Sequence, residues 1–279
     1  MRKKGAILLC ILLMLSLCAC RTNDSANINE VATDIILEET EVMNSFVSWC
    51  PYPDDYLKEL CDTYELEKLT ENCQSDYEKV ETITNWVSGL WNHDGMNQPE
   101  QGDPMYILDQ VINHGQRYRC VEYGTVISGC LNALGFECRK LGLKTKDVET
   151  REHSAGHVVS EVYLEDLKKW VFIDGQWGAI PMLEDTPLSA YEFGVAIREK
   201  DSNLKINWAN NVYQAPDSEY FEWIEPYLYY MDSQFKNVDG GYTDVMFVPD
   251  DGKNVTVFQR NYDIDIDYYL RDVSVFYYR

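Results

Sequence analysis

The sequence has little positive charge. Its 279 residues hold 24 lysines and arginines against 47 aspartates and glutamates, a formal net charge of −23 at pH 7. A protein this acidic is repelled by the phosphates of nucleic acids and by anionic lipid head groups. We therefore expect no nucleic-acid partner, and no attachment to a membrane through surface charge.

Two metal-binding signatures are also missing. The chain has nine cysteines but no C-x-x-C pair, which disfavours a structural zinc site. It has no D-x-D-x-D-G loop, so a calcium requirement has no support in the sequence. We expect no metal and no cofactor.

The apolar run near the start, "AILLCILLMLSLCA", is too short for a transmembrane span and follows three basic residues. This is the pattern of a signal peptide. Leu17-Cys18-Ala19-Cys20 resembles the bacterial lipobox, in which cleavage precedes the cysteine and lipid is attached to it. We predict a signal peptide over residues 1–19 and lipid attachment at Cys20, on the extracytoplasmic face of the cell membrane. An ordinary secretory signal or an uncleaved anchor is the alternative.

The rest of the chain suits one large domain, or a domain with an appendage. Residues 20–33 are polar and are predicted to be a flexible tether. A core domain is expected over 34–186, and an aromatic-rich region of strands over 187–279. Internal repeats, heptads and low-complexity segments are missing.

Apolar residues at helical spacing predict four helices, beginning near Pro53, Ser75, Asp103 and Cys120. The second opens with a capping-box pattern, and the third has proline at its tolerated first position. The fourth is expected to end at Gly135.

After the fourth helix the apolar period changes to two. "FECRKLGL" alternates, and "GHVVSEVYLE" and "KKWVFID" are predicted to form a hairpin. Helices followed by antiparallel strands are typical of an α+β protein. Further strands are predicted in "EYFEWIEPYLYYM", "YTDVMFV", "NVTVFQR" and "YYLRDVSVFYY", and we expect them to complete the sheet or to wall a cleft.

Three residues at the ends of predicted elements carry the chemistry. Cys120 stands in the first turn of a helix, where the unsatisfied N–H groups and the dipole favour a thiolate. Acyl transfer also needs a base and a group that orients the base. His157 opens the first hairpin strand and Asp174 closes the second, and these two ends lie side by side in an antiparallel pair. Each residue alone has an ordinary structural explanation, but their order favours a catalytic site. His153 is the alternative base.

The segments "RYRCVEYGTVISGCLNALGFECRKLGL" and "GHVVSEVYLEDLKKWVFID" resemble the core of the transglutaminase-like superfamily, over roughly residues 75–180. That superfamily includes transglutaminases, bacterial cysteine peptidases and peptide:N-glycanases. The matching positions are Cys120, Ala133-Leu134-Gly135, Arg139, His157, Glu161-Val162, Trp170-Val171 and Asp174.

The resemblance implies a papain-like α+β core, in which N-terminal helices pack on an antiparallel β-sheet. It implies that Cys120 is the nucleophile, that His157 is the general base and acid, and that Asp174 orients His157. Two positions depart from the family pattern: Val159 replaces a frequent tryptophan, and Tyr118 replaces a frequent glycine. Both alter the cleft wall and leave substrate preference open.

The oxyanion of an acyl-transfer intermediate would be held by the backbone N–H of Cys120 and one upstream donor. Trp91 is a candidate because family members use an upstream tryptophan. It competes with Trp86, Gln98, Gln101 and Gln116. Gln176 and Trp177 directly follow Asp174 and are candidates for the cleft lining.

These features predict a lipid-anchored, extracytoplasmic cysteine enzyme. It would act on amide bonds of a peptide, protein or glycopeptide through a thioester, with hydrolysis favoured over cross-linking because water is abundant. Peptide:N-glycanase activity is the nearest alternative chemistry, but the cysteine-pair zinc site of eukaryotic glycanases is missing. A non-catalytic peptide- or glycan-binding module is the alternative of another class, since tyrosines and tryptophans suit stacking on sugars. A solute-binding lipoprotein would need parallel strands in two lobes, which the strand pattern disfavours.

Outside the cytoplasm, six cysteines beyond Cys20 would allow three disulfides. Their spacing selects no pairing. We expect Cys120 to be a free thiol, and the state of the other five stays open: Cys50, Cys61, Cys73, Cys130 and Cys138.

Overall fold

The structure is a computed structural model that describes residues 46–209 and 216–277. The predicted signal peptide, the tether and Cys20 lie outside the described residues. Residues 46–273 form one compact unit, and the following paragraphs concern that unit. Helix α9 (Val273–Phe276) begins at its boundary. Within the described ranges, no helix is both long enough and apolar enough to cross a membrane.

The four predicted helices are present, and polar side chains cap two of them. Ser75 Oγ accepts the N–H of Glu78 at 3.1 Å, and the Asp103 carboxylate accepts the N–H of Tyr106 at 3.1 Å. Gly135 ends the last of these helices with a φ of 86°, which favours glycine. With one short additional helix, α3, the set is α2 (Asp54–Thr63), α3 (Leu66–Leu69), α4 (Asp76–Ser88), α5 (Pro104–His114) and α6 (Cys120–Ala133).

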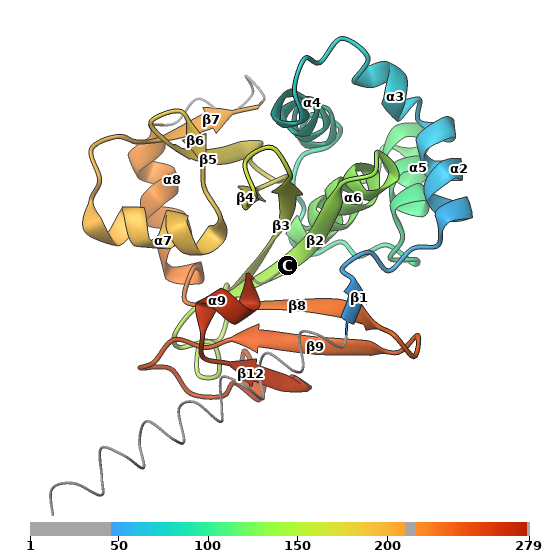
Figure 1. Cartoon of the computed structure of the whole chain (residues 1–279). Helices are drawn as coiled ribbons and strands as arrows, with labels where there is room; N and C mark the ends of the chain where they lie inside the picture. The colour runs from blue at the N-terminus through green and yellow to red at the C-terminus, as the bar shows by residue number, and fades with distance from the viewer. Residues whose placement is uncertain (1–45, 210–215, 278–279) are drawn as a thin grey trace, which may run out of the picture. The chain divides into compact units, whose positions relative to one another are not determined.

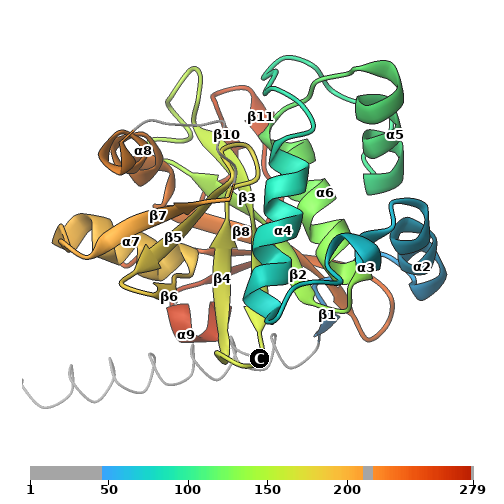
Figure 2. The same ribbon diagram turned by 90° about the horizontal axis from the view of Figure 1, so that it is seen from above.

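A seven-stranded sheet runs through the unit (Figures 1 and 2). Its strand order is β12-β9-β8-β2-β3-β4, with β1 beside β8, and every pair is antiparallel except β12 with β9. The strands are β1 (Phe46–Ser48), β2 (Glu137–Lys144), β3 (Gly156–Leu164), β4 (Lys169–Ile173), β8 (Tyr230–Asn237), β9 (Tyr242–Phe247) and β12 (Tyr268–Leu270). The predicted β3–β4 hairpin is confirmed, and the molecule is α+β.

Helix α6 is the central helix: it contacts β2 and β3 on the sheet, and α2, α4 and α5 around it. Its first turns press on β3 at Gly124, where a Cβ atom would lie 3.0 Å from Cγ1 of Val158. Ser160 Oγ also donates to the carbonyl of Gly124 at 3.1 Å. This close approach, one turn after Cys120, brings the start of α6 against the start of β3.

The C-terminal region contains helices as well as strands, so the prediction of strands throughout "EYFEWIEPYLYYM" is wrong. Its first part forms α8 (Asp217–Ile224) and a 3-10 turn, η1 (Glu225–Tyr227), and only its end belongs to β8. Aromatic side chains favour strands on average. Here, however, Tyr220 and Ile224 are four residues apart and are both buried, which is the spacing of one helix face.

The remaining elements were not predicted individually. Helix α7 and α8 lie beside a small sheet in Figure 1, in the order β6-β5-β7. A separate short hairpin pairs β10 with β11, and both of its strands come from the predicted strand region. These elements are β5 (Ala179–Leu183), β6 (Thr186–Pro187), α7 (Ala190–Glu199), β7 (Leu204–Trp208), β10 (Val257–Phe258) and β11 (Tyr262–Asp263).

A buried ion pair joins several of these elements. The Arg139 guanidinium on β2 donates to Glu161 Oε2 on β3 at 2.7 Å, and both side chains are fully buried. The guanidinium lies between the rings of Trp49 and Trp170, 4.7 and 4.4 Å from their centroids. Glu161 Oε1 accepts the N–H of Ala190 at 2.8 Å, where α7 begins. Arg139 and Glu161, which match the family pattern, therefore stabilise the fold in this molecule.

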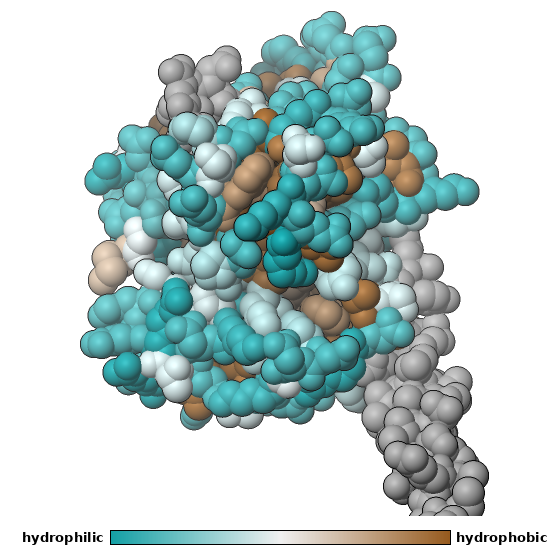
Figure 3. Space-filling view, turned by 90° about the vertical axis from the view of Figure 1, so that its left-hand side faces the viewer, coloured by the Kyte–Doolittle hydropathy of each residue, from teal (hydrophilic) through white to brown (hydrophobic). Residues whose placement is uncertain are grey.

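The principal core lies between the helices and the β3–β4 part of the sheet, and it contains Ile83, Ile107, Ile127, Val162 and Val171. Hydrophilic residues dominate the face drawn in Figure 3, where apolar residues form small, separate patches. That surface agrees with the acidic composition of the chain.

Candidate active site

Cys120 is the first residue of α6, as predicted. Arg119 before it is extended and binds Glu122 in the first turn: its guanidinium donates to Oε1 at 2.7 Å, and its N–H donates to Oε2 at 3.0 Å. Arg119 thus caps the helix together with Glu122, and its positive charge is already paired. The half-buried thiol of Cys120 faces a cleft.

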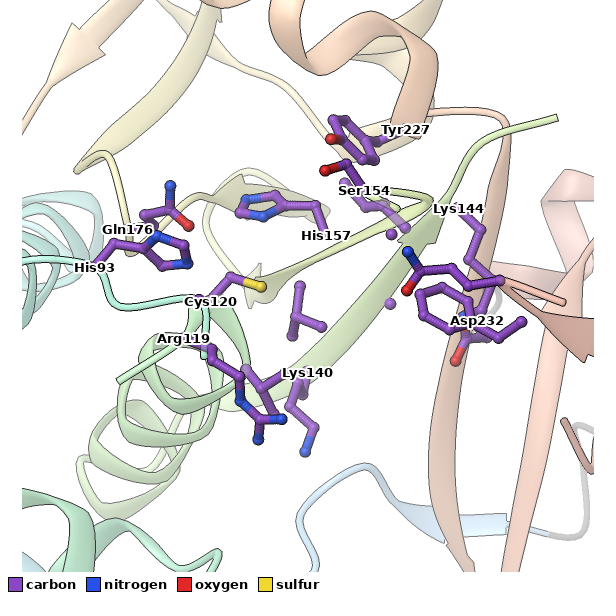
Figure 4. Close-up of a pocket in the computed structure, with 18 of the residues that line it drawn as sticks. His93, Arg119, Cys120, Lys140, Lys144, Ser154, His157, Gln176, Tyr227 and Asp232 are labelled. Atoms are coloured by element: carbon purple, nitrogen blue, oxygen red, sulfur yellow. The ribbon is translucent and has the colours of Figure 1, made fainter. Parts of the chain in front are cut away.

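His157 is the second residue of β3, and only 4% of its surface is exposed. Its Nε2 lies 2.8 Å from Oδ2 of Asp174, which directly follows β4. The expected contact between the start of one hairpin strand and the end of the other is therefore observed. Because Nε2 faces the carboxylate, Nδ1 is the ring nitrogen left for the Cys120 thiol, which lies within hydrogen-bonding reach of this imidazole. The structure brings all three residues of the predicted triad together (Figure 4 shows the cysteine and the histidine).

The carboxylate of Asp174 is fully buried and accepts four hydrogen bonds. Oδ2 accepts from the Tyr220 hydroxyl at 2.8 Å in addition to His157. Oδ1 accepts the backbone N–H groups of Gln176 and Trp177, at 3.0 and 3.4 Å. A buried carboxylate with this many donors is held in one position, which fixes the ring of His157.

The electrostatics of the pair favour charge on both partners. Burial opposes ionisation of the Cys120 thiol, but hydrogen bonds from His157 and then His93 outweigh it and lower the pKa to about 6. Burial likewise opposes protonation of His157, but the charge of Asp174 and its hydrogen bond raise the pKa of the imidazole well above its usual value. Thiolate and imidazolium therefore stabilise each other.

The cleft has a volume of about 1030 Å³ and two kinds of wall. One wall is aromatic: Trp223 packs edge-on against His157 at 5.0 Å, and Tyr227 lies 6.1 Å from the same ring. The other carries charged side chains of both signs, among them Arg119, Lys140 and Asp232, which Figure 4 labels. The aromatic wall comes from α8 and η1, outside the region that the sequence pattern covered.

Of the predicted cleft residues, Gln176 and Trp177 line the cavity. Trp91 does not: its indole N–H donates to the carbonyl of Tyr118 at 3.3 Å, and its ring stacks on Tyr123 with centroids 4.0 Å apart. The structure therefore does not bring this predicted oxyanion donor to the thiol. The competing candidates also lie outside the cavity lining, namely Trp86, Gln98, Gln101 and Gln116.

The alternative base, His153, lines the cavity but is 84% exposed and lies 3.7 Å from Glu152. Two other residues that contact the site, His93 and Tyr220, were not identified from the sequence. His93 reaches the Cys120 thiol, and nothing in its local sequence distinguishes it from the other histidines. Tyr220 reaches Asp174 from 46 residues away, which no local pattern encodes.

All six cysteines in the described part of the chain are free thiols. Burial raises the pKa of Cys50, Cys61, Cys130 and Cys138. Cys120 differs from these four cysteines because its pKa is lowered. Within the described ranges, no three His, Cys, Asp or Glu side chains are grouped to hold a metal ion.

The fold and the site are those of a cysteine-enzyme scaffold. The model of the transglutaminase-like superfamily matches residues 66–175, which include Cys120, His157 and Asp174. Residues 66–175 therefore carry a transglutaminase-like core.

Solved structures with a similar arrangement include a proposed cysteine protease from Cytophaga hutchinsonii, with 16% identity and a TM-score of 0.34 over 62% of this chain and 51% of that one. LapG from Legionella pneumophila matches with 11% identity and a TM-score of 0.31, over 62% of this chain and all of its own. The arylamine N-acetyltransferase NAT3 from Bacillus cereus has 9% identity and a TM-score of 0.31, over 68% of this chain and 85% of its own. The chain spans about half of the first of these structures. No curated protein matches the chain.

Proposed function

We propose that this protein is a cysteine hydrolase of amide bonds in peptides, proteins or glycopeptides. The observation that carries the proposal is the contact of the Cys120 thiol with His157, which is itself bound to the buried Asp174 at 2.8 Å. A thiol with a lowered pKa, a base and a group that orients the base are the three requirements of nucleophilic catalysis. The cleft of about 1030 Å³ beside the thiol supplies room for a substrate.

The reaction proceeds by acyl transfer through a thioester. The Cys120 thiolate attacks the amide carbon, a C–S bond forms, and the carbonyl π electrons move to oxygen. As this intermediate collapses, the C–N bond breaks and the His157 imidazolium gives its proton to the leaving amine. In the second half, His157 takes a proton from water, the hydroxide attacks the thioester carbon, and the thiolate leaves.

Water is the proposed acceptor because it is abundant and the cleft is open to solvent on the exposed side of His93 and His153. Transfer to a second amine is the alternative outcome. It would be measured by adding a primary amine to a turnover reaction and following products by mass spectrometry. A product that gains the amine rather than water would assign the protein to the cross-linking chemistry of the superfamily.

The first test is the alkylation rate of each cysteine against pH, on the full chain, with sites assigned by peptide mass spectrometry. We expect Cys120 to react with iodoacetamide far below the pH at which Cys50 reacts, because the Cys120 pKa is lowered and burial raises the pKa of Cys50. His157→Ala should remove that advantage. If Cys120 is alkylated at the rate of an ordinary thiol, or if His157→Ala does not alter its rate, the enzyme proposal fails. The aromatic wall then supports the binding module instead.

The proposal includes a location, the extracytoplasmic face of the cell membrane, reached through lipid on Cys20. It is supported by the basic residues, the apolar run and the lipobox-like Leu17-Cys18-Ala19-Cys20. Intact mass spectrometry of the mature N-terminus tests it directly. Cys20→Ser should release the protein from the membrane fraction, whereas Cys18→Ser should leave it there. If neither substitution releases the protein from the membrane fraction, the proposed lipid anchor is wrong.

A further inference from the structure

The segment around His93 is fixed to the chain just before the nucleophile. The Trp91 indole N–H and the Asp94 backbone N–H both donate to the carbonyl of Tyr118, at 3.3 and 2.9 Å. The Tyr123 hydroxyl donates to the carbonyl of Trp91 at 2.5 Å, and the two rings are stacked. The residues on both sides of His93 are therefore tied to the first turn of α6 and the residues before it.

This fixed segment places a second imidazole at the thiol. His93 lines the same cleft as Cys120, and its side chain lies within hydrogen-bonding reach of the sulfur. Figure 4 shows His93 and His157 approaching Cys120 from different elements. His157 is buried and bound to Asp174, so the role of base is filled, whereas His93 is exposed at the cleft mouth.

Acyl transfer at Cys120 needs a hydrogen-bond donor for the carbonyl oxygen of the substrate, which becomes negatively charged in the tetrahedral intermediate. That oxygen lies one bond from the carbon that joins the sulfur, so a side chain that reaches the sulfur can also reach the oxygen. The backbone N–H of Cys120 supplies one donor in the usual arrangement, and a second is required. Trp91 cannot be that donor while its N–H is bound to Tyr118.

We propose that His93 is a further catalytic residue, whose imidazole N–H donates a hydrogen bond to the oxyanion of the tetrahedral intermediate at Cys120. The inference rests on the proposed function. The C–S bond forms and the π electron pair moves to oxygen, where the His93 N–H stabilises it without transferring a proton. When the C–N bond breaks the pair returns to the carbonyl, and the leaving amine takes its proton from His157. Trp91 is then a positioning residue that holds the loop.

The test compares two reagents on the full chain. p-Nitrophenyl acetate acetylates Cys120 through a tetrahedral intermediate with an oxyanion, whereas iodoacetamide alkylates the same sulfur without one. Each rate is taken from the plateau of its own pH profile, so that differences in thiolate fraction between variants cancel. Cys120→Ala supplies the background from other thiols. His114→Ala is the matched control, because His114 is an exposed histidine that does not line the cleft.

We expect His93→Ala to slow acetylation about 100-fold, the usual effect of removing one oxyanion donor, while the plateau alkylation rate changes little. His93→Gln retains an N–H donor and should recover part of the acetylation rate. His114→Ala should leave both rates unchanged. The inference is overturned if the His93→Ala plateau rates fall by the same factor for both reagents, if neither falls, or if the glutamine variant recovers nothing.

Failure of this inference and failure of the proposed function give different results. If Cys120 is no activated nucleophile, the wild-type protein itself shows slow reaction with both reagents. If only the role of His93 is wrong, the wild-type protein reacts rapidly with both reagents and His93→Ala behaves like the His114→Ala control.

Discussion

The hydroxyl of Tyr220 donates a hydrogen bond of 2.8 Å to the same oxygen of Asp174, Oδ2, that lies 2.8 Å from His157. Asp174 belongs to the family core and Tyr220 lies on α8, beyond the matched residues 66–175. The orientation of the His157 ring thus depends on the matched core and on the C-terminal region, because α8 supplies one of the contacts of Asp174 in the candidate active site.

Tyr220→Phe removes this hydroxyl and keeps the ring. The Asp174 carboxylate then loses one of four donors in a buried site, which costs about 1–3 kcal/mol of unfolding free energy. Because Asp174 and His157 are held less firmly, we also expect Cys120 to react more slowly with iodoacetamide near neutral pH. Urea unfolding and the alkylation profile measure the two effects. Tyr262→Phe is the control, since Tyr262 is 64% exposed, and a Tyr220→Phe protein equal to it on both measures would contradict the assignment.

Asp174→Asn tests the orienting acid more severely. The amide occupies the same space but has no charge, so the main cause of the raised His157 pKa is lost. We expect the alkylation midpoint of Cys120 to move toward higher pH, because the imidazolium that stabilises the thiolate is less populated. By analogy with the orienting aspartate of serine proteases, turnover should fall by about 10⁴. An unchanged midpoint would remove Asp174 from the triad.

The sequence could predict the parts of the site that depend on local patterns. The helix that begins at Cys120 is marked by its apolar period and by Gly135, and the β3–β4 hairpin is marked by its alternation; together they place His157 beside Asp174. What the local pattern could not supply is the partner from a distant segment. Tyr220 and His93 meet the site only through tertiary packing, and α8 was mistaken for a strand because its aromatic residues favour strands when burial is unknown. The family pattern also suggested Trp91 at a place where its indole N–H is bound to the backbone.

The buried pair of Arg139 and Glu161 gives a prediction about stability rather than activity. Arg139→Met leaves the Glu161 carboxylate in a fully buried site without the guanidinium, and we expect a loss of about 3–5 kcal/mol of unfolding free energy. Arg139→Lys should recover little, because an ammonium cannot lie flat between Trp49 and Trp170 as the guanidinium does. Urea unfolding measures both. Equal stability of the lysine variant and the wild-type protein would show that charge alone matters here.

The last prediction concerns the pH dependence of stability. The ionisation of His157 and that of Cys120 change the free energy of unfolding in opposite directions. The pKa of His157 is raised in the folded state, so the stability it contributes is complete below its unfolded pKa of about 6.5 and is lost as pH rises through the folded value. The pKa of Cys120 is lowered to about 6, so its contribution is complete above the unfolded pKa and is lost as pH falls through about 6.

At a pH between the unfolded pKa values of His157, about 6.5, and of Cys120, about 8.5, folding removes one proton from Cys120 and adds one to His157. The number of protons bound by the pair is therefore the same in the folded and unfolded states. In wild-type protein this pair therefore adds no slope to stability between about pH 6.5 and pH 8.5. In Cys120→Ala, His157 still binds its proton through Asp174, so the folded state holds more protons than the unfolded state. That variant should lose stability relative to wild type as pH rises, by up to about 1.4 kcal/mol per pH unit. Urea unfolding at several pH values measures the difference, and parallel curves for the two proteins would mean that thiol and imidazole are not an ion pair in the folded protein.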